Sequence, residues 1–209
     1  MIKTGIGFDI HPLVKGRRLI LGGVHIKHPF GLAGHSDADA LCHALADALL
    51  GAIADGDIGE HFPDTNPRWK NSSSLDLLKR VRARLKAAQA RALHVDAILM
   101  AEAPKIAPYR QAMRRRLARA LALPLAGVSI KATTMEGLGA LGRGEGIAAL
   151  AIATVEVAKR TTDVRRRTTE QKSKHPTPNI ERPTSNGKGR MTDARRRTTG
   201  NGKKQKIIR

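Results

Sequence analysis

Residues 36–52, SDADALCHALADALLGA, carry the clearest helix signal in the chain. Ser36 is the expected N-cap, with Asp39 three residues further on, in the spacing of a capping box. The apolar residues recur every three or four positions, which places them on one face of a helix: Leu41, Leu45, Ala48, Leu49 and Ala52. We therefore expect a helix that begins at Ser36, ends near Asp55-Gly56 and packs on a sheet.

Strand signals lie on both sides of this helix. Residues 6–10 are typical of a strand, and residues 18–26 of a hairpin that turns at Gly22-Gly23. A second helix is expected over residues 74–92, because its leucines and valine keep helical spacing. A short buried strand over residues 95–100 follows it.

The last part of the predicted fold begins at Pro104, which suits the first turn of a helix ending near Leu121. Residues 128–134 indicate a strand that leads into a glycine-rich loop. Residues 147–157 are ambiguous, but their β-branched side chains favour a strand. Because strands and helices interleave, we expect an α+β domain with a mixed β-sheet and with helices packed on one face.

The charge of the chain is concentrated at its C-terminal end. The 209 residues include 38 Lys and Arg against 18 Asp and Glu, a formal net charge of +20. Residues 161–209 hold 15 basic and 4 acidic residues, six apolar side chains and no aromatic residue. That apolar surface is too small to offset the entropy lost on ordering. We therefore expect a folded domain over residues 1–159 and a disordered, basic, low-complexity tail over residues 160–209, able to contact nucleic acid without sequence specificity.

Several classes of protein are excluded by simple features. The single cysteine, Cys42, rules out a disulfide framework and a multi-cysteine zinc module. No uncharged apolar run approaches the roughly 20 residues of a membrane span. Residues 1–5 lack the apolar stretch of a signal peptide. A cytoplasmic protein with no membrane partner is the expectation.

A candidate metal site follows from the spacing of three residues. Asp9 and His11 are two residues apart on a predicted strand, so both side chains leave the same face. With His43 on the helix they form one carboxylate and two imidazoles with an open fourth position, the usual arrangement of catalytic zinc. Asp39 and Asp47 are placed behind them, and Asp47 could hydrogen-bond the second nitrogen of His43. The alternative is a set of local caps and an exposed helical histidine.

Three further stretches combine loop residues with polar groups. Residues 57–66 are either ordinary loop residues or a loop that grips a ligand near the metal. Residues 133–146 join hydroxyls, an acid and a guanidinium to many glycines, which suits phosphate oxygens and a divalent cation as well as it suits a plain turn. Residues 101–106 join a strand to the expected helix start, where free backbone N–H groups would point outwards. The arginines of residues 110–119 are interpreted as a solvated face.

A series of motifs keeps its order over residues 1–158. They are Gly-Phe-Asp-Ile-His at 7–11, His-Ser-Asp-Ala-Asp at 35–39, His43, Asp-Ile-Gly at 57–59, Phe-Pro-Asp-Thr at 62–65, Ala-Pro-Lys at 103–105, Lys-Ala-Thr-Thr at 131–134 and Gly-Arg-Gly-Glu-Gly at 142–146. Together they resemble the 2-C-methyl-D-erythritol 2,4-cyclodiphosphate synthase family of the non-mevalonate isoprenoid pathway. The resemblance implies a homotrimer with its sheets around a three-fold axis and active sites between neighbours. It also implies a lyase that converts 4-diphosphocytidyl-2-C-methyl-D-erythritol 2-phosphate to the cyclic diphosphate and CMP.

The resemblance further implies a role for individual residues. Asp9, His11 and His43 would bind one zinc ion per subunit. His35 and Thr134 would stabilise the transition state, and Glu136 would hold a magnesium or manganese ion on the diphosphate. The implied substrate-binding residues are Ser36, Asp57, Ile58, Gly59, Phe62, Pro63, Asp64, Thr65, Asn66, Ala101, Glu102, Ala103, Pro104, Lys105, Ile106, Ala107, Thr133, Met135, Ala140 and Arg143.

The chain departs from the family pattern at two places within the motifs. Ala140-Leu141 stand where the family usually has Phe-Thr, and Asn66 replaces a common acid. Neither change touches the expected metal ligands. The first is expected to alter the central apolar cavity of the family, and the second to weaken contacts with substrate.

Overall fold

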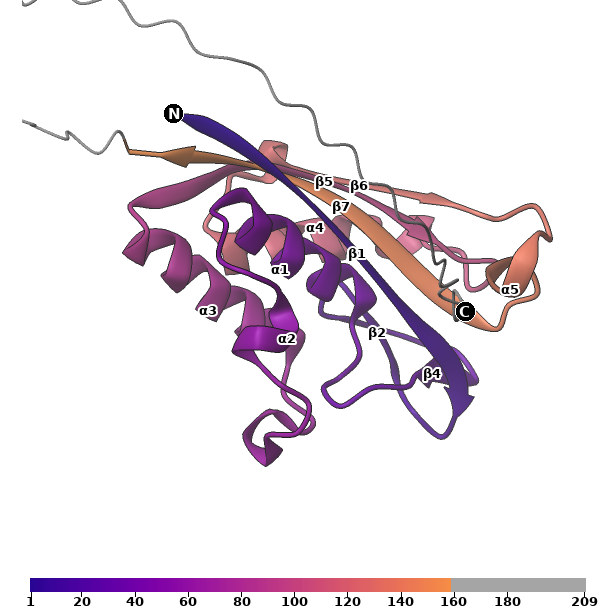
Figure 1. Cartoon of the computed structure of the whole chain (residues 1–209). Coiled ribbons are helices and arrows are strands. Elements are labelled where there is room, and N and C mark those ends of the chain that lie inside the picture. The colour runs from indigo at the N-terminus through magenta and orange to yellow at the C-terminus, as the bar shows by residue number, and fades with distance from the viewer. Residues whose placement is uncertain (159–209) are drawn as a thin grey trace, which may run out of the picture. The chain divides into compact units, whose positions relative to one another are not determined.

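The computed structural model describes residues 1–158, so the expected tail over residues 160–209 lies outside the described part. The described residues contain a five-stranded sheet in the order β4-β1-β7-β5-β6 (Figure 1). Its strands are β1 (Ile2–Lys15), β4 (Phe30–Leu32), β5 (Ala90–Met100), β6 (Val128–Thr133) and β7 (Gly146–Val157), and a separate hairpin pairs β2 (Leu19–Leu21) with β3 (Val24–Ile26).

The long helices α1, α3 and α4 lie on one face of this sheet, whereas the short α5 lies beyond the ends of the strands (Figure 1). α1 packs on β1 and β7, α3 on β5, and α4 on β6. The helical segments are α1 (Ala40–Ala52), α2 (Ile58–His61), α3 (Ser74–Ala87), α4 (Arg110–Leu121) and α5 (Gly139–Gly142), with 3-10 turns η1 (Pro67–Trp69), η2 (Ala107–Tyr109) and η3 (Leu125–Gly127). None of the helices within residues 1–158 has the length and apolar character that a membrane crossing demands.

The sheet is mixed, as expected. β7 pairs antiparallel with β1 and with β5, whereas β5 and β6 are parallel. The register places Asp9 opposite Ala149, Ala149 opposite Leu99, and Leu99 opposite Ala132. These four residues therefore form one row across the sheet. The number of strands along this row gives the approximate distance between candidate site residues on different strands.

Glycines allow α1 to lie directly against β1. A Cβ atom on Gly7 would stand 2.1 Å from the Ala44 carbonyl oxygen, and one on Gly5 would stand 2.0 Å from that of Ala48. Backbone therefore touches backbone, and the two alanines keep the helix side of the contact small. This contact sets how far the start of α1 can lie from the polar residues of β1.

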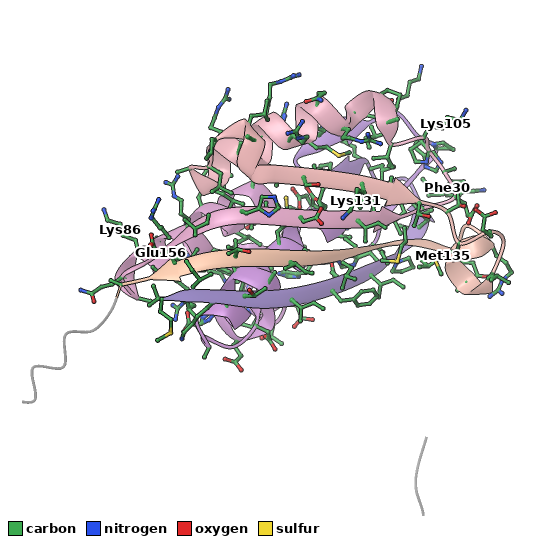
Figure 2. The ribbon with its side chains drawn as sticks, turned by 90° about the horizontal axis from the view of Figure 1, so that it is seen from above. Phe30, Lys86, Lys105, Lys131, Met135 and Glu156 are labelled. Atoms are coloured by element: carbon green, nitrogen blue, oxygen red, sulfur yellow. The ribbon has the colours of Figure 1, made fainter. Side chains whose placement is uncertain are left out.

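The opposite face of the sheet carries apolar side chains that nothing covers within residues 1–158 (Figure 2). On β1, Ile6, Phe8 and Ile10 are 66%, 52% and 49% exposed. Ile152, opposite Ile6 on β7, is 44% exposed. Isolated exposed apolar residues are common, but a contiguous row on one sheet face marks an interaction surface.

Two predicted helix boundaries are wrong. α1 begins at Ala40 rather than at Ser36, because Asp39 is the N-cap and its carboxylate accepts a hydrogen bond from Cys42 N at 3.1 Å. The helix expected over residues 74–92 ends at Ala87. Gln89 has a φ of 54°, which reverses the chain so that residues from Ala90 onwards pair with β7. Tertiary pairing overrides the helix propensity of this stretch.

The expected helix start at Pro104 is also wrong. The Ala103–Pro104 peptide bond is cis and lies in a loop, and α4 begins at Arg110. The arginines of α4 are not a purely solvated face either. Arg114 donates from Nε to Val128 O at 2.7 Å, and Arg116 donates to Gly23 O at 2.8 Å. These two side chains join the helix to the start of β6 and to the β2–β3 turn.

Candidate functional site

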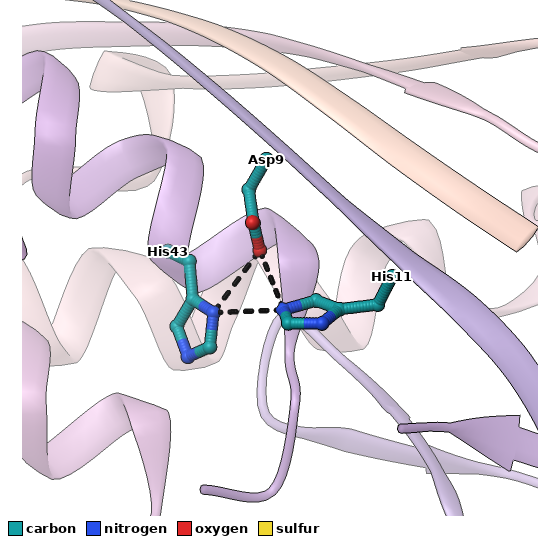
Figure 3. Close-up of side chains that lie close together, drawn as sticks. All are labelled: Asp9, His11 and His43. Atoms are coloured by element: carbon teal, nitrogen blue, oxygen red, sulfur yellow. Dashed lines mark hydrogen bonds and ion pairs between the residues drawn. The ribbon is translucent and has the colours of Figure 1, made fainter. Parts of the chain in front are cut away.

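Asp9, His11 and His43 converge at the contact between β1 and α1 (Figure 3). Alternation along β1 directs Asp9 and His11 to the helix side, as it does Gly7, and His43 lies in the first turn of α1. Asp9 Oδ2 is 2.9 Å from His11 Nε2 and 3.0 Å from His43 Nδ1, and these two nitrogens are 3.2 Å apart. The predicted cluster is confirmed.

The three side chains fit a divalent metal ion. Atoms that bind one zinc ion tetrahedrally at about 2.0–2.1 Å are roughly 3.3 Å from each other. The three distances between the ligand atoms of this cluster are 2.9, 3.0 and 3.2 Å, slightly shorter than the distance expected between zinc ligands. Two imidazoles and one carboxylate are also the donor types that zinc prefers in catalytic sites. The arrangement leaves room for a fourth ligand from the adjoining cavity.

The electrostatics of the cluster favour its charged carboxylate. Burial would raise the pKa of Asp9, but the hydrogen bonds and charges of His11 and His43 outweigh it and hold the pKa far below its usual value. Burial would lower the pKa of His43, but the hydrogen bond and charge of Asp9 outweigh it and raise the pKa. Asp9 is therefore an anion at neutral pH, ready to bind a cation.

The outer partners of His43 differ from the expected ones. Its Nε2 atom lies 3.1 Å from Ser36 Oγ and 3.0 Å from Ser74 Oγ. The prediction that the Asp47 carboxylate accepts a hydrogen bond from this nitrogen is wrong, since Asp47 Oδ1 accepts from Ile58 N at 2.8 Å. Asp47 therefore holds the start of α2 beside the metal cluster instead of orienting the histidine.

Asp39 does not support His43 through its side chain either. Its buried carboxylate accepts hydrogen bonds from Gly22 N at 2.9 Å and Gly23 N at 2.6 Å, besides capping α1. Burial raises the pKa of this carboxyl group. Asp39 thus joins the β2–β3 turn to the first turn of α1, and besides fixing that turn its charge adds to the raised pKa of His43.

A cavity of about 470 Å³ opens beside the metal cluster. It is lined by many residues of the predicted substrate-binding set, and these come from the segment before α1 and from the loop around α2. The lining residues are Asp9, His11, Gly34, His35, Ser36, His43, Ile58, Gly59, Phe62, Pro63, Asp64, Trp69 and Leu77. Sequence reasoning missed Gly34, Trp69 and Leu77. The Trp69 ring packs edge-on against Phe62, with centroids 5.1 Å apart, a contact between residues that no motif links.

Other predicted residues of this half of the site shape the loop rather than line the cavity. Asp57 caps α2 by accepting from Glu60 N at 3.0 Å, and Asn66 caps η1 by accepting from Arg68 N at 3.0 Å. Thr65 is exposed between them. His35 Nε2 lies 3.3 Å from Asn66 O, so the His35 segment and this loop are in contact.

Most of the remaining predicted site residues form a second group at the C-terminal ends of β5 and β6. Glu102 Oε1 accepts from Met135 N at 2.7 Å, and Thr134 Oγ1 donates to Glu136 Oε1 at 2.9 Å. The strand row from Asp9 to Ala132 crosses three strand spacings, or roughly 14 Å. Within residues 1–158, the cavity beside the metal cluster is lined by none of the second group. Its members are Ala101, Glu102, Ala103, Pro104, Lys105, Ile106, Ala107, Thr133, Thr134, Met135 and Glu136. The other two predicted residues, Ala140 and Arg143, belong instead to the turn before β7, where Ala140 lies beside the end of β1.

Ala140 lines a different cavity, of about 310 Å³, together with Leu141, Ile10 and Glu145. His11 and Pro12 also line it, so this cavity lies on the other side of the same strand end. Arg143 Nε donates to Glu145 Oε1 at 2.6 Å on an exposed turn. Ala140 and Leu141 place aliphatic side chains in the lining of this cavity, where the family usually has Phe-Thr.

Comparisons with known proteins match almost all of the described residues. The YgbB family model matches residues 2–156. A protein of Desulforamulus reducens named 2-C-methyl-D-erythritol 2,4-cyclodiphosphate synthase is 55% identical over 155 residues, which cover 74% of this chain and 99% of the relative. One of the same name from Salinibacter ruber is 54% identical over 157 residues, which cover 75% and 100%. A solved structure of a synthase of that name with CDP bound has a TM-score of 0.69 at 38% identity, and covers 74% of this chain and 100% of that one. The chain belongs to the YgbB family.

Proposed function

We propose that the protein converts 4-diphosphocytidyl-2-C-methyl-D-erythritol 2-phosphate to 2-C-methyl-D-erythritol 2,4-cyclodiphosphate and CMP, a step of the non-mevalonate pathway to isoprenoid precursors. One observation of the chain itself carries the proposal: the three candidate metal ligands line a cavity that His35 and Ser36 also line. The relatives named as synthases of this product support the same reaction. The substrate and product are highly charged, as expected of cytoplasmic metabolites.

The reaction is an intramolecular phosphoryl transfer. An oxygen of the 2-phosphate forms a bond to the β-phosphorus, and the bond from that phosphorus to the bridging oxygen breaks, so that CMP leaves with the electron pair. A phosphate monoester loses its second proton near pH 6, so the attacking group is already an anion at about pH 7. No protein base is required. What the protein must supply is in-line placement of two anions and neutralisation of their charge.

The candidate metal ligands and the residues that line the cavity beside them, which we call the first group, suit this task. Asp9, His11 and His43 would hold the zinc ion, which when bound supplies positive charge to a phosphoryl oxygen. His35 and Ser36 at the cavity wall would contact the phosphates, and Ile58 to Asp64 would enclose the erythritol part. Phe62 and Trp69 give the cavity an apolar wall that excludes water from the reacting groups.

The second group would bind the rest of the substrate. Ala101 to Ala107 with Thr133 would hold the cytidine, and Glu136 would bind a magnesium or manganese ion on the diphosphate. Thr134 would stabilise the transition state, and Arg143 would pair with a phosphate. The two groups lie roughly 14 Å apart across one sheet and line no common cavity within residues 1–158, so we propose that the second group acts on substrate bound at a neighbouring subunit.

A homotrimer would complete the site in this way. The uncovered apolar row of Ile6, Phe8 and Ile10 lies on the sheet face opposite the helices, where a central contact between copies would bury it. Closed symmetry would then bring the second group of one copy to the metal cluster of its neighbour. The proposed active site is therefore shared between subunits.

Ile6→Glu is expected to break this assembly. The change places a carboxylate in the apolar row, opposite Ile152, where burial without a partner is strongly unfavourable. We expect the trimer mass measured by light scattering to fall to that of the monomer, and CMP release to fall with it. Arg82→Glu, an exposed position on α3, changes charge in the same direction and should leave both unchanged. A trimeric Ile6→Glu protein, or an active wild-type monomer, would contradict the shared site.

Zinc affinity is expected to fall as the pH is lowered. The pKa of His43 is raised above its ordinary 6.5 by Asp9, which outweighs burial, so the imidazole stays protonated to a higher pH than a free one. Above that pKa the imidazole is neutral, and no proton competes with zinc for its nitrogen. Below that pKa a proton must leave His43 for each zinc ion bound, which lowers the zinc affinity by up to about tenfold per pH unit. Competition titration against a chelator of known pH dependence, over about pH 5.5–8.5, measures the slope. A flat profile would exclude His43 as a ligand.

The direct test of the proposed function is release of CMP from the diphosphocytidyl substrate by pure, zinc-loaded, full-length protein. We expect CMP and the cyclic diphosphate in equal amounts. Removal of metal by a chelator should stop the reaction, and added zinc with magnesium should restore it. Absence of CMP from the zinc-loaded protein would refute the proposal.

A further inference from the structure

We propose that Ser74 and Asp37 are positioning residues for the metal ligand His43, through a hydrogen-bond chain that runs from the Asp37 carboxylate to the Ser74 hydroxyl and on to His43 Nε2. The inference rests on the proposed metal centre. It adds to that centre two residues that the sequence motifs did not identify as part of it. Neither is expected to touch substrate or metal.

The direction of each hydrogen bond in the chain follows from the chemistry of the groups. Ser74 Oγ contacts Asp37 Oδ1, and an ionised carboxylate can only accept, so the serine proton points to Asp37. Ser74 Oγ has no second proton to give. It must therefore accept at its 3.0 Å contact with His43 Nε2, which requires a proton on Nε2.

A proton on Nε2 has a direct consequence for the other ring nitrogen. A neutral imidazole carries one N–H, so Nδ1 keeps its lone pair. Nδ1 is the atom that lies 3.0 Å from Asp9 Oδ2 and 3.2 Å from His11 Nε2. The chain thus selects the tautomer that places the lone pair at the metal position. It also makes the imidazole a stronger donor to a cation.

The surroundings hold this chain in place. Ser74 is fully buried, and its own backbone N donates to Asp37 Oδ2 at 3.0 Å. Two backbone hydrogen bonds join the same segments, from Asn71 N to His35 O at 2.9 Å and from Asp37 N to Ser72 O at 3.1 Å. The start of α3 and residues 35–37 are therefore hydrogen-bonded to each other on the Nε2 side of His43. A shift of α3 would move the ligand.

Ser36 takes a secondary part in this arrangement. Its hydroxyl lies 3.1 Å from His43 Nε2 and accepts from Ala38 N at 3.1 Å. Because that hydroxyl has no carboxylate partner among residues 1–158, its proton remains available to donate, and Ser36 alone does not fix the tautomer. Ser74 does, since its proton is committed to Asp37.

The first experiment compares the zinc affinity of metal-free, full-length Ser74→Ala with that of the wild type by competition with a chromogenic chelator. Loss of an outer-shell partner typically costs 10–100-fold in metal affinity, and we expect a loss of about that size. Ser73→Ala is the matched control, because Ser73 is an exposed helix cap whose side chain makes no capping hydrogen bond. Asp37→Asn should give a smaller loss, since the amide oxygen can still accept from Ser74.

The second experiment reads the tautomer directly and needs no variant that might fail to fold. In zinc-loaded wild-type protein labelled with 15N-histidine, the His43 ring proton should be bonded to Nε2 and exchange slowly with water. In Ser74→Ala or Asp37→Asn that exchange should accelerate, whereas a purely structural role would leave it unchanged at equal thermal stability. A proton found on Nδ1, or equal zinc affinity in wild type and Ser74→Ala, would overturn the chain alone. Failure of the wild type to bind zinc would overturn the metal centre itself.

Discussion

His43→Ala is expected to abolish zinc binding and to lower the rate of CMP release by about 10³-fold or more. The change removes one of three ligands, and the remaining Asp9 and His11 cannot hold the ion in an open tetrahedral site. A metal ion contributes several kcal/mol to stabilisation of phosphoryl-transfer charge, and each 1.36 kcal/mol corresponds to about tenfold in rate. Bound zinc measured by atomic absorption and CMP measured by chromatography should fall together.

His25→Ala is the control for this change, because His25 is an exposed histidine on β3 that belongs to neither group of site residues. It should keep both the metal and the activity. The assignment fails if the His43→Ala protein retains a full equivalent of zinc, or if it loses zinc yet releases CMP at the wild-type rate. The first result would move the metal elsewhere, and the second would separate the metal from the chemistry.

Gly7→Ala is expected to lower the free energy of unfolding by about 3 kcal/mol, which corresponds to a fall in Tm of roughly 6–12 °C for a domain of this size. The added Cβ would stand 2.1 Å from Ala44 O and 2.6 Å from Ala48 N, and both are backbone atoms of α1. Neither can rotate away, so the helix must move off the strand. His43 would move with it, away from Asp9 and His11, and we expect weaker zinc binding as well.

Gly51→Ala provides a matched control within the same helix–strand pair. A Cβ on Gly51 would meet nothing nearer than Ile6 O at 3.9 Å, an ordinary contact. Since glycine inside a helix is less favourable than alanine, this change should stabilise the protein by about 0.5–1 kcal/mol. Urea unfolding of the metal-free proteins measures both effects. Equal stability of Gly7→Ala and the wild type would show that α1 does not need its close contact with β1.

The metal cluster could be predicted because it depends on short-range rules. A strand repeats every two residues, so Asp9 and His11 had to share a face. Helical spacing placed His43 on a helix whose apolar face must pack on the sheet. The glycines of β1 set the distance between them, and the structure confirms that the three side chains meet.

The outer partners of His43 could not be predicted in the same way. Asp47 is one helical turn from His43, and this spacing predicts it as the partner, but its carboxylate accepts a hydrogen bond from Ile58 N instead. Two hydroxyls contact Nε2, one from Ser36 and one from Ser74, and Ser74 lies 31 residues further along the chain than His43. No local pattern links those two positions, because they meet only when α3 packs against α1 and the Asp37 segment crosses the start of α3.

The sequence by itself determined the alternation of strands and helices, the apolar face of the main helix and the three residues that meet at the metal position, because each depends on the repeat of one element. Only the tertiary structure decided where helices begin and end, since the cap at Asp39 and the reversal at Gln89 depend on what packs beside them. It also decided that the second group of predicted residues lies three strands from the first. Strand order is set by pairing between distant segments, and periodicity within one segment carries no record of it.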